Sequence, residues 1–279
     1  MIKITECPRD AMQGITPFIA TGKKIEYINQ LLQVGFDRLD FGSFVSEKAV
    51  PQMKDTGKVL QSLTLSKTKL LAIIANFKGA LIASEFQEVD IWGYPLSVSE
   101  TFQLRNTRKT IKEARADLEK INNLCLSARK ELHVYLSMGF GNPYNDEWSI
   151  GTLEKNCTRL IETGIRSVGL ADTVGVAQPE LIASVVSKLS RNFPELELGV
   201  HLHSTPETAF AKIKEAYESG CRAFDVTIGG YGGCPMAEDK LVGNISTETL
   251  LRYLNQENIP HSLDLNALKK ARAIARTVF

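Results

Sequence analysis

Short apolar runs alternate with longer amphipathic stretches along the whole chain. The short runs are rich in valine, isoleucine and leucine without a clean polar and apolar alternation, a pattern typical of parallel strands buried on both faces. It predicts strands at 3–7, 38–41, 70–75, 88–92, 131–136, 167–171, 196–201 and 223–228. The stretches between and after them predict helices at 23–34, 53–63, 77–86, 100–129, 153–163, 179–191, 206–219, 247–254 and 264–276.

Eight strands that alternate with helices within roughly 250 residues indicate a (β/α)₈ TIM barrel. A doubly wound open sheet is the alternative arrangement of the same elements. Length alone favours about two domains, but α/β barrels of this size form one, and no linker or repeat divides residues 1–279. Gly35, Gly164 and Gly220 lie between the end of a predicted helix and the start of the next strand, as C-cap glycines do. We therefore expect one barrel domain with a long active-site loop after the eighth strand.

Two of the four histidines lie in one tripeptide, His201-Leu202-His203, at the end of an apolar run. Residues two apart in a strand point to the same face, so both imidazoles can converge while Leu202 packs the other way. Two histidines on one side begin a divalent-metal site that a carboxylate or amide oxygen can complete. The alternative is two polar residues at a strand end that bond to neighbouring loops.

Charged and metal-binding residue types recur at the ends of the predicted strands. In a barrel of this class the chemistry lies at the carboxyl ends of the strands. Besides the two histidines, the residues at this end are Arg9, Asp10, Asp40, Asp172, Cys234 and Asn244. Any one of them could be a loop salt bridge or a helix cap, but their joint placement favours an active site.

The segment 229–235 carries four glycines around Tyr231, followed by Cys234 and a proline. Such a backbone can adopt positive φ and close over a ligand. It lacks the G-x-G-x-x-G spacing, so no nucleotide cofactor is expected. Cys234 is a natural proton donor or acceptor there, because a metal or cation lowers a thiol pKa. The alternative is a plain surface turn, and the other four cysteines fit buried structural thiols.

Composition excludes several classes of function. Lys+Arg total 33 and Asp+Glu total 32, a net charge of +1 that gives no reason to expect nucleic acid or an anionic membrane as partner. No apolar run approaches the ~20 residues of a membrane helix, and the first residues do not form a signal peptide. The five scattered cysteines indicate reduced thiols. We expect a cytoplasmic protein.

Several motifs together resemble the 3-hydroxy-3-methylglutaryl-coenzyme A lyases, a family of metal-dependent TIM barrels. Residues 7–13, Cys-Pro-Arg-Asp-Ala-Met-Gln, look like the family's G-P-R-D-G-L-Q, and 43–46 with 50–53 are similar to its S-F-V-S and V-P-Q-M. Residues 76–79 resemble N-L-K-G, 171–175 resemble G-D-T-I-G, and 230–235 resemble G-L-G-G-C-P, with Gly243-Asn244 following. The S-F-V-S segment and the G-G-C-P loop are specific to the lyase branch.

The resemblance implies a role for each matching residue. The metal ligands would be Asp10, His201, His203 and Asn244, holding Mg²⁺ or Mn²⁺. Arg9 would stabilise the enolate oxygen of a thioester, Cys234 would transfer a proton, and Asp172 would orient or activate the substrate hydroxyl. The remaining implied site residues are Asp40 as a catalytic residue and Gln13, Ser43 and Asn106 as substrate contacts. The reaction would be retro-Claisen cleavage of an acyl-CoA thioester by a homo-oligomer, expected to be a dimer.

The chain departs from the family pattern at positions that bear on the acyl group and the coenzyme. Asp40 stands where the family has glutamate, residues 14–16 read Gly-Ile-Thr where it commonly has N-E-K, and Ser204 replaces an aspartate. Three interpretations follow. The first is a 3-hydroxy-3-methylglutaryl-type lyase, the second a related aldolase or Claisen synthase acting on oxo acids, and the third a barrel that binds ligand without turnover.

Overall fold

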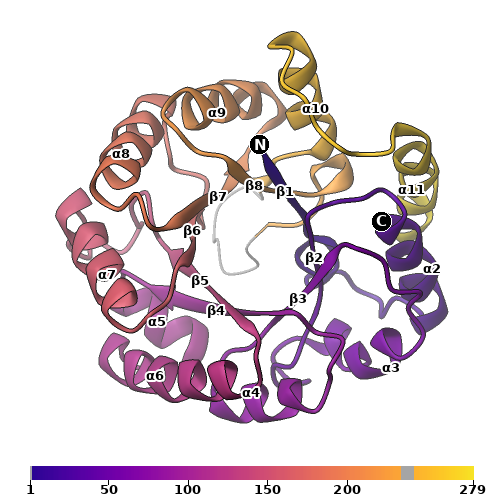
Figure 1. The fold of residues 1–279 in the computed structure, drawn as a ribbon, viewed down its shortest axis with the longest axis horizontal. Coiled ribbons are helices and arrows are strands. Elements are labelled where there is room, and N and C mark those ends of the chain that lie inside the picture. The colour runs from indigo at the N-terminus through magenta and orange to yellow at the C-terminus, as the bar shows by residue number, and fades with distance from the viewer. Residues whose placement is uncertain (1, 234–241) are drawn as a thin grey trace.

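The apolar runs form a closed ring of parallel strands in the computed structural model, which describes residues 2–233 and 242–279 (Figure 1). The ring strands are β1 Lys3–Glu6, β2 Arg38–Ser43, β3 Lys69–Ile73, β4 Ile91–Ser97, β5 Glu131–Ser137, β6 Ser167–Asp172, β7 Glu197–Ser204 and β8 Ala223–Val226. Each strand pairs in parallel with the next, and β8 pairs with β1. The ring is therefore closed, which confirms the TIM barrel and excludes the open sheet.

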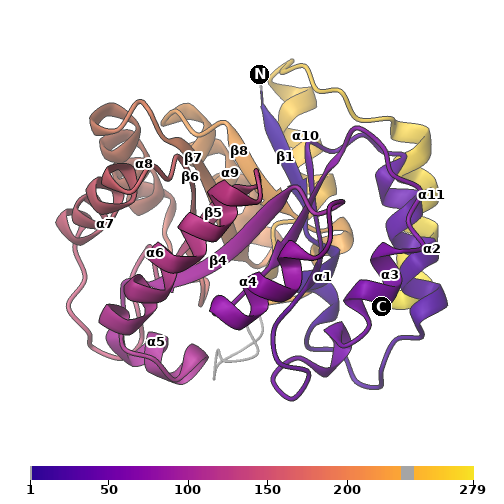
Figure 2. The ribbon, with the colours of Figure 1, turned by 60° about the horizontal axis from the view of Figure 1, so that its bottom comes forward.

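Helices cover the outside of the ring (Figure 2). They are α2 Thr21–Leu32, α3 Thr56–Leu60, α4 Phe77–Ser84, α5 Glu100–Thr107, α6 Ile111–Ser127, α7 Ile150–Glu162, α8 Pro179–Asn192, α9 Pro206–Glu218, α10 Thr247–Gln256 and α11 Leu265–Val278. The last helix packs beside α2. Gly35, Gly164 and Gly220 have φ of 83°, 85° and 107°, which confirms the helix-terminating role predicted for them.

Three predicted elements differ from the structure. The helix expected at 100–129 is two helices, because Arg108 takes a left-handed conformation with φ of 59° and Thr110 starts α6 with a capping box. The strand expected at 88–92 runs instead from Ile91 to Ser97. The helix expected at 53–63 is a 3₁₀ turn, η1 Pro51–Met53, followed by α3.

Two short elements at the carboxyl rim position the polar residues. Arg9 and Asp10, which follow the first strand as predicted, lie on the one-turn helix α1, Pro8–Met12, whose residues are all buried. Residues 243–244, expected in a loop, form β9, Gly243–Asn244, which pairs antiparallel with the end of β7. This pairing sets Asn244 opposite His203. A further 3₁₀ turn, η2 Ile228–Gly230, leads from β8 into the glycine segment.

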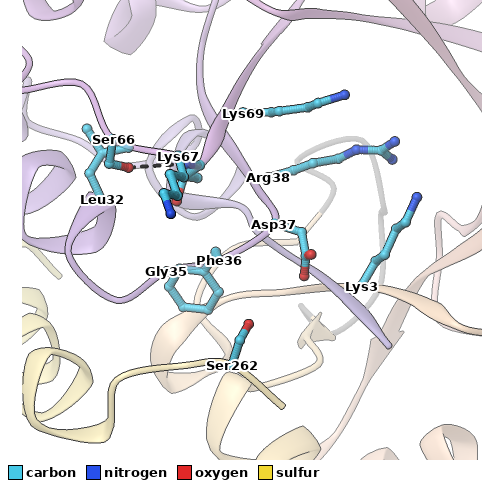
Figure 3. A pocket seen from close by; sticks show the side chains of 11 residues that line it. Lys3, Leu32, Gly35, Phe36, Asp37, Arg38, Ser66, Lys67, Lys69 and Ser262 are labelled. Atoms are coloured by element: carbon cyan, nitrogen blue, oxygen red, sulfur yellow. Dashed lines mark hydrogen bonds between the residues drawn. The ribbon is translucent and has the colours of Figure 1, made fainter. Parts of the chain in front are cut away.

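The opposite, amino end of the barrel is closed by ion pairs. Arg38 at the start of β2 contacts Glu131 of β5 and Glu197 of β7, each at 2.6 Å. A hollow of about 590 Å³ opens beside this network, lined in part by Lys3, Arg38 and Lys69 (Figure 3). Those three cations are paired with Glu131 or Glu197, so the hollow lies in a network that closes the barrel, away from the carboxyl rim.

Candidate metal and active site

Four polar side chains from three rim elements meet at the carboxyl end of the barrel. Ligand atoms of Asp10, His201 and His203 all lie within 4.8 Å of one another. Asn244 joins them because its Nδ2 donates to Asp10 Oδ2 at 2.7 Å. These four residues, called the metal cluster below, are the ones that the resemblance names as ligands. The alternation of β7 places both histidines on one face, as the His-x-His spacing predicts.

Each imidazole is oriented by a hydrogen bond at its Nδ1 atom. His201 Nδ1 lies 3.1 Å from Asp225 Oδ2, and His203 Nδ1 lies 3.0 Å from the Thr173 carbonyl oxygen. A carbonyl only accepts, so His203 carries its hydrogen on Nδ1 and keeps a lone pair on Nε2. That Nε2 is buried and has no hydrogen-bond partner among the described residues. Such an atom is costly to leave unsatisfied, and a divalent cation would satisfy it.

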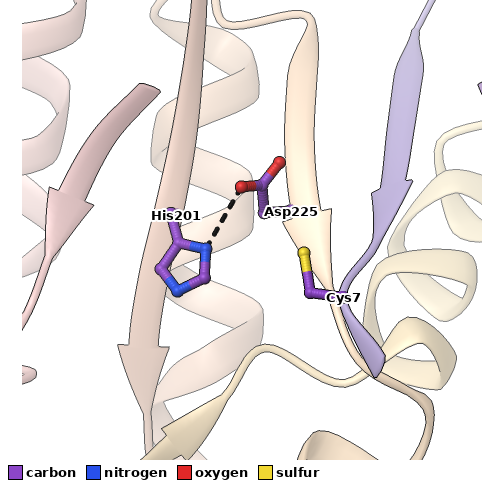
Figure 4. A group of neighbouring side chains, drawn as sticks. All are labelled: Cys7, His201 and Asp225. Atoms are coloured by element: carbon purple, nitrogen blue, oxygen red, sulfur yellow. Dashed lines mark hydrogen bonds and ion pairs between the residues drawn. The ribbon is translucent and has the colours of Figure 1, made fainter. Parts of the chain in front are cut away.

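A second triple, of Cys7, His201 and Asp225, also places its ligand atoms within 4.8 Å of one another (Figure 4). Burial raises the pKa of the Cys7 thiol well above its usual value, and the thiol faces the Thr5 carbonyl at 3.8 Å. The Asp225 carboxylate is already bonded to His201. We therefore assign this group to the orientation of His201 rather than to a second metal site.

Arg9 connects the metal cluster to Asp40. Its Nε lies 3.0 Å and its Nη2 2.5 Å from Asp40 Oδ2, while Nη1 donates to Asp10 Oδ1 and Gln13 Oε1 at 3.0 Å each. Gln13 in turn donates to Asp10 at 2.8 Å. Arg9 and Asp40 are buried, so this fork fixes the guanidinium in one orientation. Asp40 lies within β2, upstream of its last residue Ser43.

Burial and neighbouring charges act against each other in this group. Burial raises the pKa of Asp40 to about 6, although Arg9 opposes the shift. Burial also disfavours an ionised Asp10, but Arg9 and the two histidines outweigh it and lower the pKa of that carboxyl. Asp10 therefore stays a carboxylate near neutral pH, as a metal ligand must.

The glycine segment approaches the metal cluster closely. A Cβ atom on Gly232 would lie 2.7 Å from Asn244 Nδ2 and 2.9 Å from the Asp10 carbonyl oxygen. Tyr231 accepts a hydrogen bond from Asn244 at 2.9 Å through its carbonyl, and its ring stacks on Phe279 with centroids 4.5 Å apart. The segment therefore needs glycine where it passes the ligands. Cys234, the proposed proton carrier, lies outside the described residues.

The remaining sequence-predicted residues occupy different surroundings. Asp172 is buried, with Oδ1 accepting from the Ala177 amide at 3.1 Å and Oδ2 from Lys212 at 2.8 Å. Ser43 is buried, and its Oγ has no partner among the described residues. Asn106 is exposed on α5, and no hydrogen bond among the described residues connects it to the metal cluster.

Sequence reasoning missed Asp225 and Lys212, although each leaves a local signal. Asp225 is a carboxylate in a short apolar strand, beside Phe224 and Val226. Lys212 is a lysine on the buried face of an amphipathic helix, between Ala209 and Ala216. Charged residues at such positions are rarely buried without a partner. The pattern at both positions therefore predicts a buried partner, but it does not identify the partner residue.

Comparison with known proteins agrees with this geometry. The HMGL-like family model matches residues 2–275. The chain is 33% identical to hydroxymethylglutaryl-CoA lyase YngG of Bacillus subtilis over 95% of this chain and 88% of that protein. It is 28% identical to an (R)-citramalyl-CoA lyase of Chloroflexus aurantiacus, over 94% and 85%.

Among solved structures, an HMG-CoA lyase from Acinetobacter baumannii in complex with coenzyme A and 3-methylmalate superposes with a TM-score of 0.92. It is 33% identical and is matched over 91% of its length, with all of this chain covered. The family resemblance drawn from the motifs is confirmed, and the chain belongs to the HMGL-like family.

Proposed function

We propose that the protein is a divalent-metal-dependent carbon–carbon lyase. Its substrate would be 3-hydroxy-3-methylglutaryl-CoA or a similar 3-hydroxyacyl-CoA, cleaved to acetyl-CoA and acetoacetate or the corresponding keto product. The observation that carries the proposal is the fixed contact between Arg9 and Asp10 at 3.0 Å, beside two histidines on one strand face. Arg9, a cation that can stabilise an oxyanion, is thus bonded directly to Asp10, one of the residues that can hold a metal.

The metal would be Mg²⁺ or Mn²⁺, held by Asp10, His201, His203 and Asn244. The donor set fits, because it has a carboxylate and an amide oxygen with two imidazoles and no thiolate. When bound, the cation would supply Lewis acidity that lowers the pKa of the substrate hydroxyl. The relatives named as lyases of acyl-CoA thioesters support this class of substrate.

Arg9 would stabilise the enolate oxygen that develops on the thioester. A guanidinium has five N–H donors, and within the described residues the bonds to Asp40, Asp10 and Gln13 occupy all but one, which lies on Nη2. This Nη2 donor can bind an oxyanion. Its direction is fixed because the hydrogen bonds to Asp40 hold the guanidinium in one orientation. Ser43 Oγ, buried and without a partner among the described residues, would contact the substrate, as would Gln13 and Asn106.

Proton transfer would involve Cys234 and Asp172. Cys234 would protonate the enolate from the segment that follows Gly233. Asp172 would help to orient or activate the substrate hydroxyl, and both of its oxygens also accept hydrogen bonds from the protein. Cys234→Ser should retain metal binding but turn over poorly, since serine is a far weaker acid at neutral pH.

A panel of substrates tests the proposal. The purified protein is assayed with Mg²⁺ and with Mn²⁺ against 3-hydroxy-3-methylglutaryl-CoA, citramalyl-CoA and free oxo acids with acetyl-CoA. We expect cleavage of a 3-hydroxyacyl-CoA that stops when EDTA removes the metal. Turnover only in the condensing direction on oxo acids would identify the aldolase or synthase alternative. Binding without turnover of any compound would identify a non-catalytic barrel.

We also propose that the protein is cytoplasmic and forms a homodimer. In residues 2–233 and 242–279, no helix is long and apolar enough to cross a membrane. Sedimentation velocity across a range of concentrations measures the oligomeric state directly, and a single monomeric species would contradict the dimer.

A further inference from the structure

Lys212 is a buried cation directly behind the metal cluster. It lies on α9, is 3% exposed, and shares the inner face of that helix with Ala209, Ile213 and Ala216. Its Nζ donates to Asp172 Oδ2 at 2.8 Å, to the His203 carbonyl at 2.7 Å and to the Gly175 carbonyl at 3.4 Å. An ammonium has three hydrogens, so its donors are fully used on two neighbouring strand ends.

Those acceptors lie on the turn 172–175 and on the end of β7. The relative position of these two segments determines the orientation of the His203 ring. The turn 172–175 carries the Thr173 carbonyl, which bonds His203 Nδ1 at 3.0 Å. Lys212 donates hydrogen bonds to this turn at Asp172 and Gly175, and it donates another to the backbone carbonyl of His203. The Lys212 ammonium thus links the turn that carries the Thr173 carbonyl to strand β7, which carries the His203 imidazole.

We propose that Lys212 is a positioning residue for the metal site, which keeps His203 Nε2 directed at Asp10 and His201 by clamping the 172–175 turn to the end of β7. The inference rests on the metal site proposed above. Asp172 is also the counter-ion that holds Lys212 in place. Without the clamp, the turn and the strand can separate, and the ring loses the contact that selects its tautomer.

The chain offers a matched control in Lys24. It is also buried at 2% exposure, pairs with Asp55 at 2.7 Å and donates to the Gln52 carbonyl. It lies on α2 and bonds to the segment before α3, and none of its hydrogen bonds within the described part of the chain involves the metal cluster. Loss of either lysine leaves a buried aspartate unpaired, which is destabilising in both places. Only the Lys212 variant should affect metal binding.

Mn²⁺ titration by calorimetry compares the wild type with Lys212→Met and Lys24→Met. We expect Lys212→Met to weaken Mn²⁺ binding by at least about tenfold, in the 10–100-fold range typical of lost outer-shell partners. Lys24→Met should bind as the wild type does. Should Lys212→Met fail to fold, Lys212→Gln, which keeps amide donors without the charge, should show a smaller weakening in the same direction.

A second readout uses the metal-free protein. The ¹⁵N shifts of His203 should report one Nδ1–H tautomer in the wild type and a mixture in Lys212→Met. Wild-type Mn²⁺ affinity in a folded Lys212 variant, with an unchanged tautomer, would overturn the role of Lys212 while leaving the metal site standing. Absence of Mn²⁺ binding by the wild type would overturn the metal site itself and the inference with it.

Discussion

His201 and His203 share one strand face but are anchored differently, one by a carboxylate and the other by a backbone carbonyl. Burial and the neighbouring His201 lower the pKa of His203, so His203 is neutral and ready to bind a cation. Burial also opposes a charge on His201, but Asp225 and Asp10 outweigh it and raise its pKa. Asp225 and the Thr173 carbonyl thus orient the two imidazoles without belonging to the metal cluster.

Removal of a ligand should separate function from stability. We expect His201→Ala to abolish both activity and Mn²⁺ binding with little loss of folding, because residues at the carboxyl rim serve function more than stability. His261→Ala removes a histidine outside the metal cluster and should leave both unchanged. Calorimetry with Mn²⁺ and a thermal melt measure the two properties. Undiminished metal binding by His201→Ala would remove this residue from the ligand set.

Arg9 should be separable from the ligands. Arg9→Gln keeps a hydrogen-bonding side chain but removes the charge directed at the enolate. It should retain Mn²⁺ binding and lose roughly 3 kcal/mol of transition-state stabilisation, about 100-fold or more in kcat. Steady-state kinetics checks this, with metal affinity measured on the same sample. A rate within a factor of two of the wild type would contradict an enolate-stabilising role.

At the scale of elements, two segments after β8 complete the rim. β9 returns antiparallel to β7 and delivers Asn244 opposite His203. The glycine segment crosses over Asp10 and Asn244 at distances that no side chain would permit. Both segments depend on backbone conformation as much as on side chains, since Gly232 has φ of 92° and Gly230 has φ of 71°.

A methyl group at Gly232 should disturb the rim without removing any ligand. Gly232→Ala places Cβ 2.7 Å from Asn244 Nδ2 and forces a positive φ on alanine, which costs on the order of 1–2 kcal/mol in strain alone. We expect a folded protein with weaker Mn²⁺ binding. Gly22→Ala is the matched control, since its Cβ would meet nothing within 4 Å on helix α2. Equal metal affinity in the two variants would show that the rim accommodates the methyl group.

At the scale of the whole molecule, Glu6 helps to join the first and last parts of the barrel. It lies at the end of β1, fully buried, and accepts from the Ile228 amide at 2.7 Å and from Thr247 Oγ1 at 2.6 Å on α10. Burial raises its pKa to about 8, although the two hydrogen bonds oppose the shift. The folded state therefore holds a proton on Glu6 at pH values where the unfolded chain has lost it.

The sign of the pH dependence follows from that proton. Between the unfolded pKa near 4.5 and the folded pKa near 8, the folded state binds more protons, so stability from this group falls as pH rises. Glu6→Gln should remove this fall, which is on the order of a few kcal/mol. Urea unfolding at pH 5 and pH 8 measures it in both proteins. An identical pH dependence in the two would show that Glu6 is ionised in the folded state.

The sequence by itself determined the repeating strand-and-helix order, and with it the barrel. Short apolar runs and amphipathic stretches depend on whether a local element is buried on both faces or on one, so they can be read without knowing what packs against it. The local alternation of side chains along a strand placed His201 and His203 on one face of β7. The motif 7–13 located Asp10 and the pair Gly243-Asn244 located Asn244, and the structure brings both residues to that face.

Only the tertiary structure decided what holds those residues in place. Asp225 contacts His201 from the neighbouring strand β8, and Lys212 contacts Asp172 from the helix that follows the next strand. The pairing of β9 with β7 was likewise missed. Such contacts join residues far apart in sequence, and no periodicity records a distance between separate elements. Their physical origin is the closed barrel, which gathers the carboxyl ends of all its strands at one rim.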